Sequence, residues 1–145
     1  MRFLSRLFSR TKDAPMPASP EARPYATIST GDGFREMTRV EVDAELIAPM
    51  TECTAVLRRA TEAIERRLAS EGKRETPNAL SKAHQILAAT EPLCRKMSDT
   101  LMSMSFESDA AEQAFGQHIQ RLFFAQSGLS QAIKQMEKEK VNRLQ

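Results

Sequence analysis

The chain has 145 residues, of which 41% are hydrophobic and 28% are charged, and these values fit one globular or coiled-coil domain with a single core. Its net charge is +2, but the first twelve residues carry +4 and the remainder therefore −2, so we expect no basic surface that could bind nucleic acid. Two cysteines are too few for a disulfide framework, and no stretch holds the roughly 20 apolar residues of a membrane-spanning helix, which favours a cytoplasmic protein.

Residues 1–12 predict a short basic helix with two different faces. Phenylalanine and leucine side chains fall on one face, and arginines recur at every fourth position on the other. Such a helix suits the surface of an anionic membrane, at its inner face for a cytoplasmic protein, or a groove in the body of the chain or in a partner protein. We predict that this contact uses Arg2, Phe3, Leu4, Arg6, Leu7, Phe8 and Arg10.

The same segment also resembles a mitochondrial transit peptide, which is amphipathic, rich in arginine and serine, and poor in acidic residues. Residues 23–26 (Arg-Pro-Tyr-Ala) resemble the arginine-containing sites at which such presequences are cleaved, whereas Asp13 and Glu21 are unusual in them. The alternative to a cytoplasmic protein is therefore a mitochondrial protein whose N-terminal segment is removed.

Residues 13–37 predict a linker without regular secondary structure. Four prolines lie between Asp13 and Pro24, and proline lacks the amide donor that helices and sheets need. The stretch from Asp13 to Pro24 is therefore expected to be a semi-rigid, extended linker. Residues 31–33 (Gly-Asp-Gly) signal a turn, and residues 26–37 are expected to be irregular. The helical domain is expected to begin directly after it, at residue 38.

The rest of the chain predicts three long helices, each with a start signal. Residues 38–41 (Thr-Arg-Val-Glu) have the capping-box pattern and open the first helix, which is expected to end near Glu71. Residues 76–77 (Thr-Pro) open the second, because threonine caps a helix and proline suits its first turn. Ser108 or Asp109 is expected to cap the third.

Two prolines interrupt this regularity. Pro49 is expected to kink the first helix, or to divide it into a short lead-in and a main segment, because its ring crowds the carbonyl group four residues earlier. Pro92 is expected to kink the second helix for the same reason.

Apolar residues alternate at spacings of three and four along all three helices, which is the pattern of a coiled-coil seam. Helices of about 28–35 residues are roughly 40–50 Å long, which is longer than a compact domain of this size needs. The loops between consecutive helices are short, and the second of them is expected over 105–108, so consecutive helices should pack antiparallel.

We therefore predict an all-α fold: an elongated, coiled-coil-like antiparallel three-helix bundle over 38–145, behind the amphipathic helix and the proline-rich linker. The predicted seams consist of Leu46, Met50, Cys53, Leu57, Ala60 and Ile64, then Leu80, Ala83, Leu87, Thr90, Cys94, Met97, Leu101 and Met104, and finally Ala111, Phe115, His118, Leu122, Ala125, Leu129, Ala132 and Met136.

This antiparallel arrangement predicts one layer of the bundle with two thiols and an imidazole. Cys53 and Cys94 are equally far from the first turn, and Cys94 lies level with Ile119 and His118 across the second. Because zinc and copper(I) accept such ligands, Cys53, Cys94 and His118 are a candidate metal site, and the two thiols a candidate disulfide. The alternative is ordinary packing, in which buried cysteines act as small apolar residues.

Methionines gather near the end of the second helix, where Met97, Met102 and Met104 follow Cys94. Their sulfur atoms suit copper(I), but flexible methionines also form adaptable faces that bind other proteins. This cluster predicts an alternative function, a secretion or assembly chaperone that holds an amphipathic client segment on a methionine-rich face.

The sequence has no glycine-rich phosphate loop, no nucleophile elbow and no HExxH zinc motif. His84 stands alone on the second predicted helix and is expected at the surface. We therefore expect neither an enzyme nor a cofactor. The leading prediction is a non-enzymatic helical adaptor or scaffold that binds other proteins and contacts a membrane or a partner with its N-terminal helix. We also expect homo-oligomers, because pairing of two chains would cover apolar surface. A metal-binding bundle is a further alternative.

Overall fold

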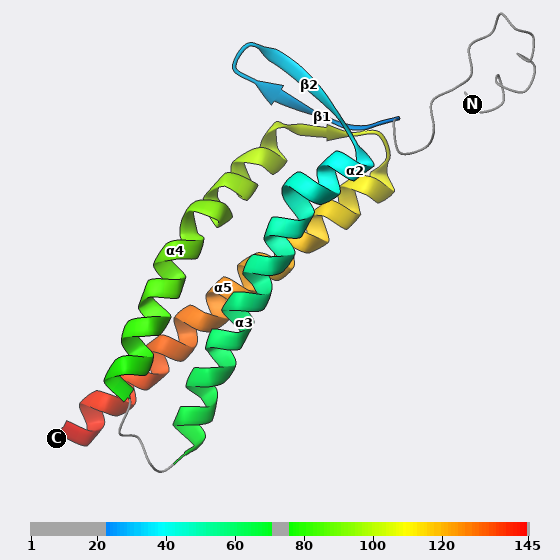
Figure 1. Ribbon diagram of the computed structural model, residues 1–145. Helices are drawn as coiled ribbons and strands as arrows, with labels where there is room; N and C mark the ends of the chain where they lie inside the picture. The colour runs from blue at the N-terminus through cyan, green and yellow to red at the C-terminus, as the bar shows by residue number, and fades with distance from the viewer. Residues whose placement is uncertain (1–22, 71–75, 145) are drawn as a thin grey trace, which may run out of the picture.

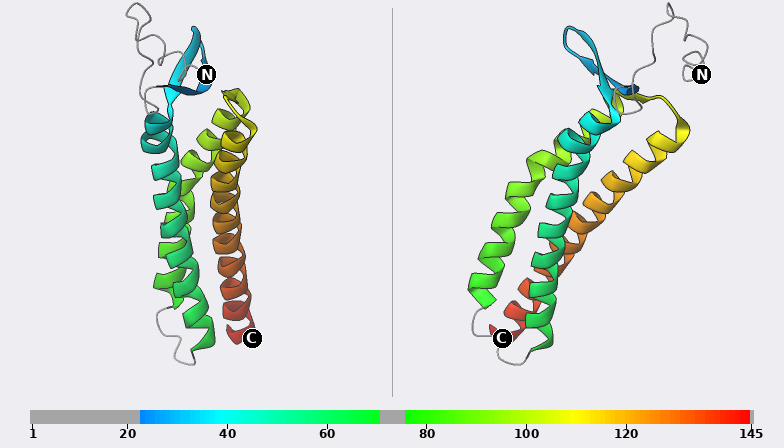
Figure 2. Two further views of the ribbon diagram at one scale, coloured as in Figure 1. Left: turned by 90° about the vertical axis from the view of Figure 1, so that its right-hand side faces the viewer. Right: turned by 45° about the vertical axis from the view of Figure 1, so that its right-hand side comes forward.

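The computed structural model describes residues 23–70 and 76–144, so the predicted helix over 1–12 and the linker up to residue 22 lie outside the described residues. The described chain is elongated and mostly helical, with a small sheet at one end (Figure 1). It starts at this sheet end, and its last helix finishes at the opposite end of the bundle (Figure 2).

The sheet has three antiparallel strands in the order β2-β1-β3, where β1 is Pro24–Thr30, β2 is Gly33–Thr38 and β3 is Met104–Phe106. β1 and β2 form a hairpin that projects beyond the helices (Figure 1). Two predictions were therefore wrong: that residues 26–37 are irregular, and that residues 105–108 are only a loop. The fold is mostly helical and not purely all-α.

The hairpin has a physical basis in its turn and in one buried pair. Thr30 pairs with Gly33 across the two-residue turn, and Gly33 has φ = 153°, a conformation that glycine adopts without steric cost. At the base of the hairpin Ala26 lies opposite Met37, and both side chains are buried against the helices. β3 is a strand only because the connection between two helices runs beside Ala26 and pairs with it.

The first predicted helix consists of three consecutive segments: α2 (Arg39–Val42), η2 (Asp43–Ile47) and α3 (Ala48–Ala69). Its capping box is confirmed. The Glu41 amide donates to the Thr38 hydroxyl at 3.2 Å, and the Thr38 amide donates to the Glu41 carboxylate at 2.9 Å, so two amides without helical partners are satisfied.

η2 is a turn of π-helix directly before Pro49. In it the Ala48 amide donates to the carbonyl group of Asp43, five residues earlier. In a regular α-helix the Pro49 ring would crowd the carbonyl group of Glu45, and proline has no amide to donate. The wider turn accommodates the ring. The predicted division of the first helix at Pro49 is therefore confirmed.

α4 (Thr76–Ser103) and α5 (Asp109–Leu144) confirm the second and third predicted helices. α4 continues through Pro92, so this proline does not end the helix. Before α5 the Ala111 amide donates to the Ser108 hydroxyl at 3.1 Å, which identifies Ser108 as the cap. α3, α4 and α5 pack on one another, with α4 antiparallel to both α3 and α5, so the predicted three-helix bundle is confirmed (Figures 1 and 2).

The core runs along the length of the bundle and contains most of the predicted seam residues, together with Ile119 and Ile133. This burial confirms the alternating spacing of three and four. The seam positions that are only half-buried are Ala60, Leu87, Thr90, Leu101, Met104 and His118.

None of the helices in the described ranges is both long enough and apolar enough to cross a membrane.

Three aromatic rings join the sheet to the bundle. The ring of Phe106 in β3 lies 6.3 Å from that of Tyr25 in β1, edge to face, and 5.3 Å from that of Phe115 in α5. The Glu107 amide also donates to the carbonyl group of Tyr25 at 3.0 Å. The first described residues are thus held against the start of α5.

Candidate functional site

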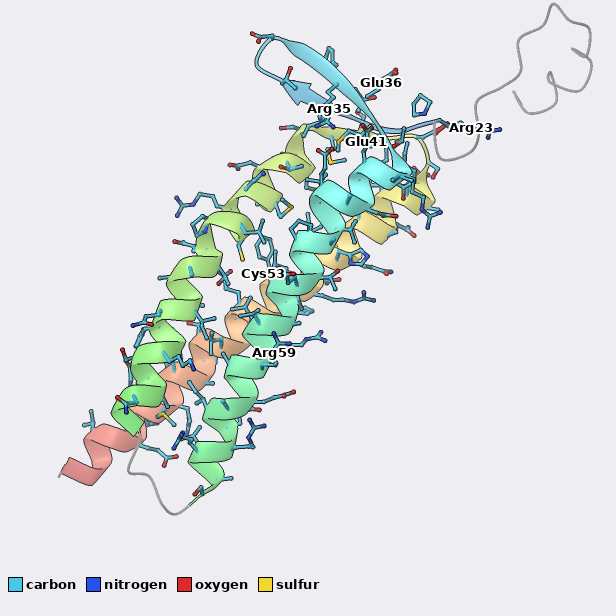
Figure 3. The ribbon with its side chains drawn as sticks, viewed as in Figure 1. Arg23, Arg35, Glu36, Glu41, Cys53 and Arg59 are labelled. Carbon is cyan, nitrogen blue, oxygen red and sulfur yellow. The ribbon has the colours of Figure 1, made fainter. Side chains whose placement is uncertain are left out.

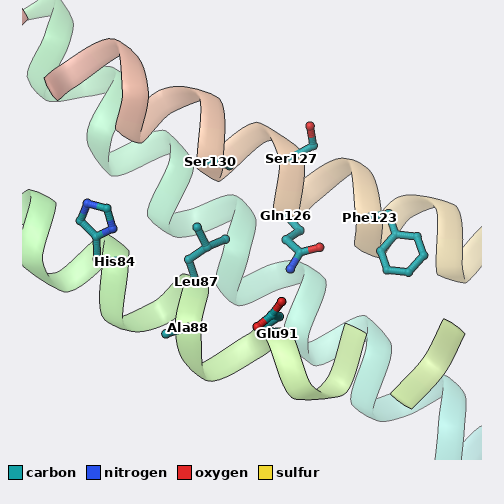
Figure 4. A pocket seen from close by; sticks show the side chains of 8 residues that line it. All are labelled: His84, Leu87, Ala88, Glu91, Phe123, Gln126, Ser127 and Ser130. Carbon is teal, nitrogen blue, oxygen red and sulfur yellow. The ribbon is translucent and has the colours of Figure 1, made fainter. Parts of the chain in front are cut away.

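A groove of about 560 Å³ runs between α4 and α5 and has a mixed polar and apolar lining (Figure 4). We call it the α4/α5 groove. The charged groups at this groove already have partners: Nε2 of His84 lies 2.9 Å from the carboxylate of Glu137, and the Glu91 carboxylate lies 3.2 Å from the Arg95 guanidinium. The groove is lined by His84, Leu87, Ala88, Glu91, Phe123, Gln126, Ser127 and Ser130.

His84 is exposed, as predicted, but it is not isolated. Its partner Glu137 lies on a different helix, 53 residues later in the chain. Because Nε2 of His84 faces this carboxylate rather than Ser127 or Ser130, the groove does not show a histidine paired with a hydroxyl nucleophile. The contact instead joins α4 to α5.

A second groove, of about 350 Å³, lies between α3 and α4, and no residue of α5 lines it. We call it the α3/α4 groove. Its floor is apolar and built largely of alanine, from Val56, Ala60, Ala63 and Ile64 on α3 and from Ala79, Ala83 and Ile86 on α4. Among the described residues, the charged ones that line it are Arg59, Arg67 and Lys82, all of them basic.

Helical periodicity explains why these residues share one groove. The lining positions on each helix recur at spacings of one, three or four, which places them along a single face. Arg59 projects from the middle of α3, one and a half turns beyond Cys53 (Figure 3). The sequence places these alanines either in the seam or in no site. It gives no sign that Arg59 and Lys82 line a groove, because exposed cations are common on helices and only the position of the neighbouring helix shows that these two share one surface.

Cys53 and Cys94 are both buried, and neither forms a disulfide. Burial raises the pKa of the Cys53 thiol above its ordinary value of 9.0. Burial, and then the electrostatic influence of Cys53 and Glu91, raises the pKa of the Cys94 thiol to about 11. Both groups are therefore uncharged thiols at neutral pH.

The third member of the predicted metal site, His118, is half-buried on α5. Within residues 23–70 and 76–144, no three His, Cys, Asp or Glu side chains lie close enough to hold a metal ion together. The structure therefore does not bring Cys53, Cys94 and His118 together as a ligand set, and the chemistry of the two neutral thiols fits core packing.

The methionine cluster is divided between the core and the surface. Met97 is completely buried, Met104 is half-buried in β3, and Met102 is 85% exposed. These side chains therefore do not form one exposed face for a client segment.

The sheet end carries three large exposed apolar side chains and an ion-pair cluster. Phe34, Val40 and Met102 are 79%, 53% and 85% exposed. Arg35 in β2 donates two hydrogen bonds to the Glu45 carboxylate, at 3.0 and 2.8 Å, and its guanidinium lies 3.7 Å from the Glu41 carboxylate (Figure 3). This pairing raises the pKa of Arg35 and lowers that of Glu45, in both cases chiefly through the hydrogen bond between them.

The predicted membrane-contact residues between Arg2 and Arg10 lie outside the described part of the chain. Comparison of the chain with protein families, with curated proteins and with solved structures finds no match. Its function must therefore be inferred from its own surfaces.

Proposed function

We propose that this protein is a non-enzymatic helical adaptor, whose three-helix body binds other proteins and whose basic N-terminal segment contacts an anionic membrane surface. The observation that carries the proposal is the position of Arg23, where the described chain begins. It lies at the sheet end of the molecule, in a pocket that Val40 also lines, and this end also carries the exposed side chains of Phe34 and Met102. The described chain therefore begins at the end that carries three of its five large exposed apolar side chains.

Both grooves lie away from that end. The α4/α5 groove begins at Glu91, twelve residues or about 18 Å of helix before the last residue of α4, Ser103. The α3/α4 groove uses Ala79 to Ile86, still farther from the sheet. A membrane contact at the sheet end would leave both grooves accessible to partner proteins, which is the arrangement that an adaptor requires.

The basic segment supports reversible membrane contact. Near an anionic surface each basic residue contributes about 1 kcal/mol, and the phenylalanine and leucine side chains add apolar burial. Replacing Arg2, Arg6 and Arg10 by glutamine should therefore weaken binding by about 3 kcal/mol, or roughly a hundredfold.

Flotation with liposomes tests this proposal. The full-length protein should float with anionic vesicles and not with neutral ones, and the triple glutamine variant should not float with either. The matched control replaces three exposed arginines of the body, Arg58, Arg66 and Arg121, by glutamine, which changes the net charge equally and should leave flotation unchanged. If both triple variants float as well as the unaltered protein, or if the control loses binding as the N-terminal variant does, the N-terminal contact is refuted.

A further inference from the structure

The α3/α4 groove differs from the other helical groove in its charge. Of the residues that the structure describes, Arg59, Arg67 and Lys82 line it and no acidic residue does, whereas Glu91 lines the α4/α5 groove and Glu137 lies beside that groove. Within the described ranges, the structure gives Arg59 and Lys82 no ion-pair partner. Two cations therefore stand at an apolar groove with no counter-charge from the described chain.

The floor of this groove is suited to a helix. Alanine side chains at 60, 63, 79 and 83 are short, so a backbone can approach closely and pack its own side chains against the half-buried Val56 and Ile86. On α3 the lining extends from Val56 to Arg67, which is about 17 Å or three helical turns. A helix of that length, laid between α3 and α4, would extend the three-helix arrangement to four helices.

We infer that the α3/α4 groove binds an acidic amphipathic helix of about three turns from another protein, with its apolar face on the alanine floor and its carboxylates beside Arg59 and Lys82. This inference rests on the adaptor function proposed above and names the chemistry of the partner. The chain's own N-terminal segment fits this groove less well than an acidic helix does, because its four cations would be repelled by the basic rim.

Titration of the full-length protein with synthetic peptides tests the inference. The probe is a fluorescently labelled 14-residue peptide with leucine and alanine on one helical face and glutamate on both flanks. One matched peptide has lysine at every glutamate position, and another has the same composition in scrambled order. Fluorescence anisotropy should show saturable binding of the acidic amphipathic peptide alone, and its affinity should fall as salt rises because the charges are exposed.

Four protein variants locate the contact. Arg59→Glu combined with Lys82→Glu should weaken binding by about tenfold or more, because two attractions become repulsions. Ala63→Phe should abolish binding by filling the groove, and since Ala63 is exposed this change does not overpack the core. Arg58→Glu and Lys96→Glu are the matched controls, because both residues are exposed and lie outside this groove, and they should bind normally.

The inference is overturned if the acidic peptide does not bind, if the lysine or scrambled peptide binds equally, or if Arg58→Glu weakens binding as much as the groove variants do. Sedimentation equilibrium provides a separate check on a second copy of the chain as occupant. A dimer that Ala63→Phe dissociates would assign the groove to self-association and overturn the inference. None of these assays contains lipid, so their outcome is independent of the flotation experiment that tests the membrane contact.

Discussion

The contact between sheet and bundle can be tested at one aromatic side chain. Phe115 lies on α5 with 1% of its surface exposed, and its ring is 5.3 Å from that of Phe106 in β3. Replacing Phe115 by alanine leaves a cavity in a closely packed core, which costs about 3–5 kcal/mol. About 0.5–1.5 kcal/mol of that loss comes from the aromatic contact with Phe106. For a domain whose total stability is about 5–15 kcal/mol, this is a large fraction.

The assay is urea denaturation followed by far-ultraviolet circular dichroism. The matched control is Phe124→Ala, the same substitution on the same helix at a side chain that is 67% exposed, and it should change the free energy of unfolding by less than about 0.5 kcal/mol. A double-mutant cycle of Phe115→Ala with Phe106→Ala should give an interaction energy of at least about 0.5 kcal/mol, because the two rings touch.

Two outcomes would refute this reasoning. If Phe115→Ala and Phe124→Ala lower stability equally, the burial of Phe115 in the core is incorrect. If Phe115→Ala is costly but the cycle shows no coupling with Phe106, then β3 does not pack on α5, and the sheet does not form as described.

Two further predictions concern a buried thiol and a helix cap. The folded-state pKa of Cys94 is about 11 and the ordinary value is 9.0, so the unfolded chain loses this proton first as pH rises. The free energy of unfolding should therefore be unaffected by this group well below pH 9 and should fall by at most about 2.7 kcal/mol between about pH 9 and pH 11. Urea denaturation under reducing conditions should show this loss, and Cys94→Ala should have a correspondingly shallower pH dependence; equal slopes in the two proteins would contradict the raised pKa. Thr38→Ala removes the hydroxyl that accepts from the Glu41 amide and should cost about 1 kcal/mol in the same assay, whereas Thr38→Ser should cost only a few tenths; if the serine variant is as unstable as the alanine variant, the hydroxyl does not cap the helix.

The sequence by itself determined the three helices, the caps of the first and third, and the buried faces. These features depend on residues close together in the chain: the spacing of three and four that places Leu57 and Leu122 in the core, the Thr38–Glu41 capping box, and the proline that divides the first helix at residue 49. The turn at Gly31-Asp32-Gly33 was also recognised, but its flanking strands were not, because only Ala26 and Met37 show a buried face and two residues make no detectable alternation.

Only the tertiary structure decided how distant segments meet. β3 is a strand because Met104–Phe106 runs beside β1, some 80 residues earlier in the chain, and three residues carry no strand signal of their own. His84 on α4 contacts Glu137 on α5, and Arg59 on α3 lines the same groove as Lys82 on α4. Both pairings depend on how the helices are rotated and how they cross. Local spacing shows which face of a helix is buried, but the surface where two helices adjoin depends on packing between residues far apart in sequence, and the candidate binding groove lies on that surface.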